Sequence, residues 1–259
     1  MLDFQADAAE NVDGGSARSE AEGDIASVDH DIAGHAAPGE SKMTSVLRRY
    51  GGFVWVYQLA LAIGLFSLPQ VAAAKTVLAF GDSLMAGYQL RPGEGFAPQL
   101  QAAFRAKGRD VVVVNAGVSG DTTVQGKARV KWVLAGMKVK PDLVILELGA
   151  NDMLRGQSPA AAKANLDAMI SAFEATGVRV ILAGMLAQPN LGAKYVKEFN
   201  ALYPALAKQR GVAFYPFFMD GVAAVPGLQL GDGLHPTPKG VKVIVGKILP
   251  LVMRELDRK

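Results

Sequence analysis

The chain has 259 residues and a formal net charge of +3, half of its residues are hydrophobic, and it contains no cysteine. This length is enough for one or two domains. The absence of cysteine excludes disulfides, a cysteine nucleophile and a cysteine-ligated metal site.

The first 42 residues differ in composition from the rest of the chain. They carry ten acidic and two basic side chains, and their apolar residues follow neither the helical nor the strand period. Such a segment buries too little apolar surface to offset the conformational entropy lost on folding. We therefore predict that residues 1–42 form a disordered acidic extension. Because a leader-like segment follows, we also expect Met43 to be the true start, with 1–42 arising from an upstream start assignment.

Residues 43–74 have the pattern of a secretory signal peptide. Two arginines make the start basic, an uncharged apolar run follows as far as Leu68, and three alanines stand immediately before Lys75. This order predicts a periplasmic or secreted protein whose signal peptide is cleaved after Ala74. The alternative is an uncleaved membrane anchor, since about 18 apolar residues are the lower limit for crossing a bilayer. The A-x-A site favours cleavage.

The remaining part, residues 75–259, carries 23 basic and 14 acidic side chains, a net charge of +9. A basic surface attracts anionic lipid headgroups or acyl carriers, so we expect at most a transient contact with a membrane surface. Ordinary solubilising charge is the alternative. No compact cluster of Lys and Arg with interleaved aromatic residues is present, so we expect no nucleic-acid binding. We expect this part to be one domain and a monomer.

Strand-like and helical segments alternate along this domain. Apolar or β-branched runs predict buried strands at Thr76–Phe80, Val111–Val114, Leu143–Leu148, Val178–Met185 and Val212–Phe217. Helical spacing and helix start signals predict helices at Phe96–Lys107, Thr123–Met137, Ser158–Thr176, Lys194–Gln209 and Thr237–Leu256. Strands that alternate with helices of this length form right-handed βαβ units. The sequence therefore predicts an α/β fold, a three-layer α/β/α sandwich with a flavodoxin-like five-stranded parallel sheet.

Polar and glycine-rich segments follow four of the predicted strands. They are residues 81–84 (GDSL), 115–121 (NAGVSGD), 149–152 (GAND) and 231–236 (GDGLHP). In sheets of this kind the ligand site lies at the carboxyl ends of the strands. We expect the four segments to meet at one edge.

His235 is the single histidine of the domain, because the other two histidines of the chain lie in the acidic extension. It follows Asp232 by three residues in a loop restrained by Gly and Pro, so one ring nitrogen can face a carboxylate and the other the cleft. A serine nucleophile needs such a base and such an orienting group. Asp-x-x-His alone is a weak signal, but beside Ser83 at another strand end it predicts a catalytic triad.

Ser83 also has two non-catalytic interpretations. A serine after a strand often caps the following helix, and a glycine-rich turn between strand and helix is where phosphate-binding proteins place backbone N–H groups. Neither explains the Asp232/His235 pair. Met85 stands where the strained G-x-S-x-G elbow has its second glycine, so the sequence disfavours an α/β-hydrolase.

The four segments resemble the four sequence blocks of the SGNH (GDSL) hydrolase superfamily, and the resemblance covers residues 75–252. Within it the chain is most similar to the bacterial periplasmic thioesterase I/lysophospholipase L1/arylesterase group, to which segments 190–195, 199–204 and 216–219 add support. The resemblance implies the SGNH hydrolase fold. It also implies a serine hydrolase that cleaves carboxylic esters and acyl thioesters through an acyl-enzyme.

Carried onto this chain, the resemblance implies that Ser83 attacks the acyl carbonyl, with His235 as the base and Asp232 as its orienter. It also implies an oxyanion hole made of the backbone N–H groups of Ser83 and Gly117 and the side-chain amide of Asn151. Fixed donors at that position stabilise the charge that develops on the carbonyl oxygen.

Two loops line the substrate groove in the resembled group. The resemblance therefore implies substrate contacts at Met153, Leu154 and Leu191. An equal alternative is that Met153 and Leu154 only pack beneath a helix. We expect medium to long acyl esters and thioesters as substrates, including lysophospholipids and aryl esters. The alternatives are a carbohydrate acetylesterase of the same superfamily and a non-catalytic lipid- or phosphate-binding module.

Three further acidic residues lie in the same segments, namely Asp82, Asp121 and Asp152. We expect them to brace turns or cap helices, because short Asp and Asn side chains commonly do so. Once the triad is assigned, no set of histidines and carboxylates remains for a metal. We therefore expect no metal and no cofactor.

Overall fold

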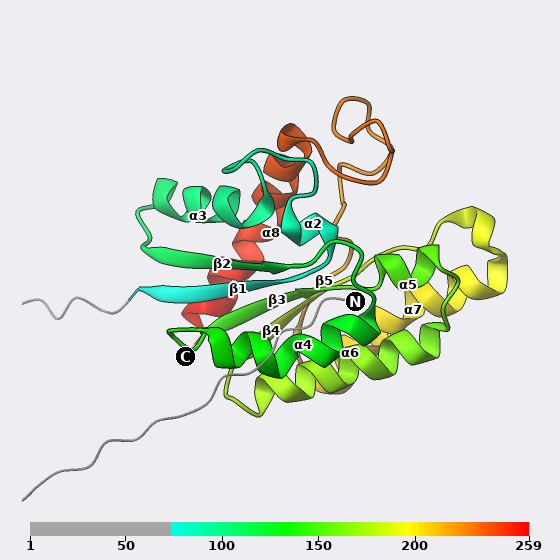
Figure 1. Cartoon of the computed structure of the whole chain (residues 1–259), viewed down its shortest axis with the longest axis horizontal. Coiled ribbons are helices and arrows are strands. Elements are labelled where there is room, and N and C mark those ends of the chain that lie inside the picture. Colours follow the sequence, from blue (N-terminus) through cyan, green and yellow to red (C-terminus); the bar gives the residue numbers. More distant parts are fainter. Residues whose placement is uncertain (1–73, 259) are drawn as a thin grey trace, which may run out of the picture. The chain divides into compact units, whose positions relative to one another are not determined.

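A parallel five-stranded sheet forms the centre of the structure, a computed structural model that describes residues 74–258 (Figure 1). Its strands are β1 (Lys75–Gly81), β2 (Val111–Gly117), β3 (Leu143–Glu147), β4 (Arg179–Ala183) and β5 (Ala213–Tyr215). Their order is β2-β1-β3-β4-β5, and every neighbouring pair is parallel. The acidic extension and nearly all of the signal peptide lie outside the described residues, so both stay predictions.

Helices cover both faces of the sheet, which confirms the predicted three-layer sandwich (Figure 1). One face carries α3 (Phe96–Ala106) and α8 (Pro238–Asp257), which pack against each other. The other face carries α4 (Thr123–Gly136), α6 (Pro159–Glu174) and α7 (Ala193–Arg210). The shorter elements are α2 (Ser83–Ala86), α5 (Ala150–Leu154) and the 3-10 turn η1 (Pro189–Leu191).

Burial on both faces explains the apolar runs of the central strands. All five residues of β3 are buried, and β1 is buried from Thr76 onward. A parallel sheet between two helical layers needs such runs because neither face meets water. β5 is shorter than the predicted strand at 212–217, since only three residues at this edge of the sheet pair with β4.

The start signals of the long helices form the caps that the sequence predicts. Ser158 Oγ accepts the N–H of Ala161 (3.5 Å) at the start of α6, and Thr237 Oγ1 accepts the N–H of Gly240 (3.2 Å) at the start of α8. The sequence did not predict α2 and α5, because helices of four and five residues are too short to show a period. Among the helices of residues 74–258, none has both the length and the apolarity of a bilayer-spanning segment.

The last residues of three neighbouring strands stand side by side in the sheet, and the candidate site lies directly beyond them. Gly81 of β1 pairs with Gly117 of β2 and with Glu147 of β3. The segments that follow these strands therefore leave the sheet next to one another, at its carboxyl edge. The loop from β5 to α8 comes to the same edge and brings His235 with it.

The start of α8 packs against the loop that carries His235, and this predicts opposite effects for two Gly→Ala changes in one helix. An added Cβ at Gly240 would overlap Leu228 O, whereas nothing lies within 4 Å of a Cβ at Gly246. We expect Gly240→Ala to lower the free energy of unfolding by about 1–3 kcal/mol through overpacking. We expect Gly246→Ala to raise it by up to about 1 kcal/mol through helix propensity. Urea unfolding measures both values, and effects of the same sign would contradict the close approach.

Candidate active site

Ser83 and His235, 152 positions apart in the chain, meet at the carboxyl edge of the sheet. Ser83 is the first residue of α2, directly after β1 and Asp82. The Nε2 atom of His235 lies 2.8 Å from Ser83 Oγ. The other ring nitrogen, Nδ1, lies 2.6 Å from Asp232 Oδ2. The structure thus brings together the three residues that the sequence predicts as a triad.

The carboxylate of Asp232 is held by its own loop. Its Oδ1 accepts the backbone N–H groups of Leu234 (2.9 Å) and His235 (3.0 Å). Loss of solvent raises the pKa of Asp232, but these two N–H groups and the His235 ring outweigh it and lower the pKa to about 2. Asp232 is therefore ionised at neutral pH, where it favours the His235 tautomer that carries its hydrogen on Nδ1.

Tyr88 covers one face of the His235 ring, a contact that sequence analysis did not identify. The two ring centroids are 4.4 Å apart. The chain turns sharply on either side of Tyr88, because Gly87 and Gln89 have positive φ angles of 79° and 56°. This turn presents the tyrosine ring to the imidazole and limits its rotation. No local motif marks such a contact, since it joins residues far apart in the chain.

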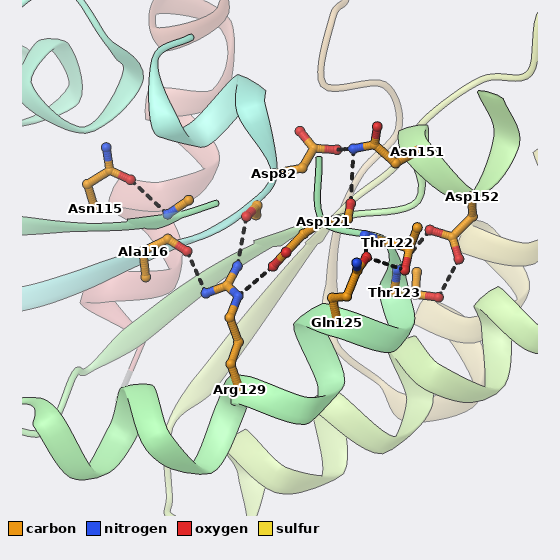
Figure 2. A network of polar contacts seen from close by, with 12 residues as sticks. Asp82, Asn115, Ala116, Asp121, Thr122, Thr123, Gln125, Arg129, Asn151 and Asp152 are labelled. Carbon is orange, nitrogen blue, oxygen red and sulfur yellow. Dashed lines mark hydrogen bonds and ion pairs between the residues drawn. The ribbon is translucent and has the colours of Figure 1, made fainter. Parts of the chain in front are cut away.

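Asn151, in the first turn of α5, presents its amide beside Ser83. The Nδ2 atom donates to the backbone carbonyl of Asp121 (3.0 Å) and to Asp82 Oδ2 (3.2 Å), as Figure 2 shows. Asn151 and Ser83 line the same cavity. The 3.2 Å contact is at the long end of the hydrogen-bond range, so this N–H can also be shared with an oxygen bound next to Ser83.

The structure differs from the prediction at Gly117. Gly117 ends β2, where it pairs with Gly81, and its N–H donates to Asn115 Oδ1 (2.8 Å). It does not line the cavity that contains Ser83. A side chain at Gly117 would overlap the backbone of Ala86, so the close approach of α2 accounts for this glycine. Gly117 is therefore not placed to donate to a substrate oxygen.

Gly120 takes the position that was predicted for Gly117. It lines the cavity together with Ser83 and Asn151, in a turn closed by a hydrogen bond from Asp121 N–H to Val118 O (3.2 Å). Its φ of 86° lies in the left-handed region that glycine adopts without strain. The sequence contained a signal for this residue. A turn with a positive φ favours glycine, and in segment 115–121 the turn lies at Gly120, whereas Gly117 ends the strand.

Several carboxyl groups are buried beside the triad. They are Asp82, Asp121, Asp152 and Glu147. Two of them brace loops as the sequence predicts. Asp152 accepts the N–H (2.8 Å) and the hydroxyl (2.5 Å) of Thr123 at the start of α4, and Asp121 pairs with Arg129 (2.6 Å), as Figure 2 shows.

Asp82 caps α2, since its Oδ1 accepts the N–H of Leu84 (3.0 Å). Its side chain is buried, and burial raises the pKa of Asp82 to about 6. The Leu84 N–H and the charge of His235 lower the pKa, whereas the charges of Asp121 and Asp152 raise it further. A buried acid with a raised pKa thus stands directly before Ser83.

Glu147, the last residue of β3, is a buried acid that sequence analysis did not identify. Its side chain is 0% exposed, and neither carboxyl oxygen has a hydrogen-bond partner among the described residues. A Cβ built on Gly81 would lie 2.6 Å from Glu147 Oε2, so this carboxyl group lies directly behind the segment that carries Ser83. Burial and the charge of Asp82 raise the pKa of Glu147 well above its ordinary value and outweigh the nearby Asp82 N–H, which lowers it. The neutral acid is therefore favoured.

A cavity of about 330 Å³ opens beside Ser83 and His235. Its apolar lining consists mainly of Met153, Leu154, Met185, Leu186, Phe217, Met219 and Leu234. Met153 and Leu154 lie there as the sequence predicts, although Met153 is also buried in the core. Leu191 does not, because it lies in η1 and packs against the core. Within residues 74–258, no three His, Asp or Glu side chains are grouped so that they could hold a metal ion.

The chain is similar to known proteins in both sequence and structure. Residues 79–243 match the GDSL-like Lipase/Acylhydrolase family. The chain is 42% identical to Esterase TesA of Pseudomonas aeruginosa, across 69% of this chain and 88% of that protein. It is 37% identical to Thioesterase 1/protease 1/lysophospholipase L1 of Escherichia coli, across 64% of this chain and 78% of that protein. The crystal structure of AlinE4, an SGNH-hydrolase family esterase, superposes on this structure with a TM-score of 0.61. The match covers 73% of this chain and 100% of AlinE4, and the two sequences are 43% identical.

Glu147→Gln tests the buried neutral acid. Because the fold holds the pKa of Glu147 above its ordinary 4.5, the contribution of this group to stability is complete below that pH and declines as the pH rises. Glutamine cannot ionise. We therefore expect the unfolding free energy of the variant, relative to wild type, to increase from pH 5 to pH 8, by at most about 1.4 kcal/mol per pH unit. Urea unfolding across this range measures it, and a difference independent of pH would contradict the assignment.

Proposed function

The chain belongs to the GDSL-like lipase/acylhydrolase family and is a hydrolase of carboxylic esters and acyl thioesters, and we propose that Ser83 is its nucleophile. The observation that carries this proposal is the 2.8 Å contact between Ser83 Oγ and His235 Nε2. A serine hydroxyl is a weak nucleophile on its own and needs an adjacent base to accept its proton. His235 is in position to do so, and Asp232 holds its other nitrogen at 2.6 Å.

The reaction follows from this arrangement. As Ser83 Oγ attacks the acyl carbon, its proton passes to His235 Nε2, and the imidazolium is stabilised by ionised Asp232. When the tetrahedral intermediate collapses, His235 returns the proton to the leaving alcohol or thiol, and the acyl group stays on Ser83 as an ester. Water then attacks this ester with His235 again as the base, which releases the acid and restores the serine.

We propose an oxyanion hole built from the backbone N–H groups of Ser83 and Gly120 and from Asn151 Nδ2. All three residues line the cavity around Ser83 Oγ, whereas Gly117 does not. Donors that are already in place stabilise the charge on the carbonyl oxygen without a reorganisation cost during the reaction. The bond from Asn151 Nδ2 to Asp121 O (3.0 Å) keeps the amide in position for this role.

The lining of the cavity favours acyl chains over sugars as the bound group. Three of its residues are methionines, whose unbranched side chains adapt to flexible ligands. Trp132 offers no sugar platform, since it lies on α4 with 77% of its surface exposed and does not line the cavity. We therefore propose medium to long acyl esters and thioesters, aryl esters and lysophospholipids as substrates. Deacetylation of a carbohydrate is the second candidate.

Ser83→Ala tests the nucleophile. We expect it to abolish labelling by a fluorophosphonate and to lower kcat on p-nitrophenyl esters at least about 10³-fold, because no other group replaces the acyl acceptor. Ser158→Ala is the matched control, since Ser158 caps α6 and does not line the cavity. It should keep full labelling and activity. Labelling of Ser83→Ala at the wild-type rate would contradict Ser83 as the nucleophile. A wild-type protein that is not labelled at all, with no loss of function in Ser83→Ala, would favour a non-catalytic lipid-binding module.

A chain-length series tests the substrate class. With p-nitrophenyl esters and acyl-CoAs we expect kcat/KM to rise from acetyl to medium chains, because each buried CH₂ contributes about 0.8 kcal/mol. Leu154→Ala should weaken this dependence, since Leu154 lines the cavity. Leu191→Ala is the control, because Leu191 packs against the core. If acetylated sugars were hydrolysed and longer acyl compounds were not, the carbohydrate esterase would be the better function.

A further inference from the structure

Arg129 lies beneath the proposed oxyanion hole and touches none of the cavity. It belongs to α4, its side chain is 14% exposed, and it does not line the cavity around Ser83. Its guanidinium lies 3.9 Å from the centroid of the Phe80 ring in β1. The catalytic steps described above make no use of this partly buried cation.

The guanidinium joins the end of β1 to both ends of segment 115–121, as Figure 2 shows. Its Nε lies 2.6 Å from Asp121 Oδ2, Nη1 donates to Ala116 O (2.8 Å), and Nη2 donates to Gly81 O (2.8 Å). Because the fork is planar and rigid, these three bonds set the position of segment 115–121 relative to the end of β1. Bonds from a cation to carbonyl or carboxylate oxygens are also the stronger class of hydrogen bond.

The two segments carry the backbone donors Ser83 and Gly120, and Asp121 links them to Asn151. Gly81 stands two residues before Ser83 at the end of β1. Ala116 stands near the end of β2, which leads directly into the turn that contains Gly120. The backbone carbonyl of Asp121 accepts Asn151 Nδ2 (3.0 Å), so the side chain of Asp121 joins Arg129 while its main chain holds Asn151.

The charge of Arg129 bears on the same site. Buried carboxyl groups surround the place where negative charge develops on the substrate, and the charges of Asp121 and Asp152 raise the pKa of Asp82 there. Arg129 pairs directly with Asp121. Arg155 reaches the same turn from the solvent side, where its Nη2 donates to Gly120 O (2.9 Å). Arg129 supplies the positive charge on the buried side.

We propose that Arg129 is a positioning residue for the oxyanion hole. It holds the segments of Ser83 and Gly120 directly and that of Asn151 through Asp121, without contacting substrate. This inference rests on the proposed function. If Arg129 formed only a structural ion pair with Asp121, its loss would lower stability but leave the turnover of the folded molecules unchanged.

The test uses Arg129→Met, which keeps the apolar stem over Phe80 and removes the fork, and Arg129→Lys, which keeps the charge alone. We expect kcat per active site to fall about 100-fold in Arg129→Met and about 10-fold in Arg129→Lys, with KM within about threefold, because loss of one oxyanion donor costs about 10²–10³ in kcat. Exhaustive fluorophosphonate labelling counts the folded sites. Guanidinium added to Arg129→Ala should restore part of the lost rate.

Two inhibitors separate positioning from general loosening. A trifluoromethyl ketone forms a tetrahedral oxyanion on Ser83, and its affinity should fall in parallel with kcat/KM. The fatty-acid product lacks that geometry, and its affinity should change less than about threefold. If both affinities fell together, or if kcat per labelled site in Arg129→Met stayed within threefold of wild type, the positioning role would be overturned.

Arg210→Met is the matched control. Arg210 Nε lies 2.6 Å from Asp167 Oδ1, which joins α7 to α6 by an ion pair of the same length outside the cavity. We expect its kcat to equal that of wild type. If Arg129→Met does not fold, Arg129→Lys and the guanidinium rescue still decide the question. Full labelling of Ser83→Ala would refute the nucleophile itself, an outcome distinct from any result with Arg129.

Discussion

Gly81, Gly117 and Glu147 stand next to one another at the ends of three neighbouring strands, and the segments of the site leave the sheet from that level. Hydrogen-bond register, not side-chain chemistry, sets this level. The two glycines let α2 and the neighbouring strand approach closely, because a Cβ at Gly117 would overlap Ala86 and one at Gly81 would lie against Glu147. A shift of one strand by a single residue would move Ser83 away from both Asn151 and His235.

Negative charge gathers at this site, because several carboxyl groups are buried near the proposed oxyanion hole. The structure treats these groups differently. Asp232 is ionised because backbone N–H groups and His235 lower its pKa to about 2, while burial raises the pKa of Glu147 and favours its neutral form. Asp121 is offset by Arg129, and Asp152 by the start of α4. Environments that push the pKa values of like groups apart are typical of sites that carry out acid–base chemistry.

The sequence was sufficient to predict the sandwich and the contacts of His235 with Ser83 and Asp232. Strand runs, helix caps and a single histidine are local signals, and parallel strands must present their carboxyl ends at one edge. The contacts that it did not predict are set by packing. Tyr88 reaches His235 through a turn at Gln89, which no sequence motif marks. Glu147 ends an otherwise apolar strand, and the sequence does not show that its side chain is buried. Gly120 was missed because two glycines in one loop compete, and only the backbone angles decide between them.

Ser83 and His235 meet in the folded domain but lie far apart along its chain. Ser83 follows its first strand, and His235 comes just before its last helix, with 152 positions between them. During synthesis the hydroxyl therefore emerges long before its base, and for most of that time it is an ordinary serine. Reactivity arises only when the end of the chain docks onto the beginning. In the proposed mechanism, a chain that still lacks His235 has no base for Ser83, so esterase activity would report that the end of the chain has docked.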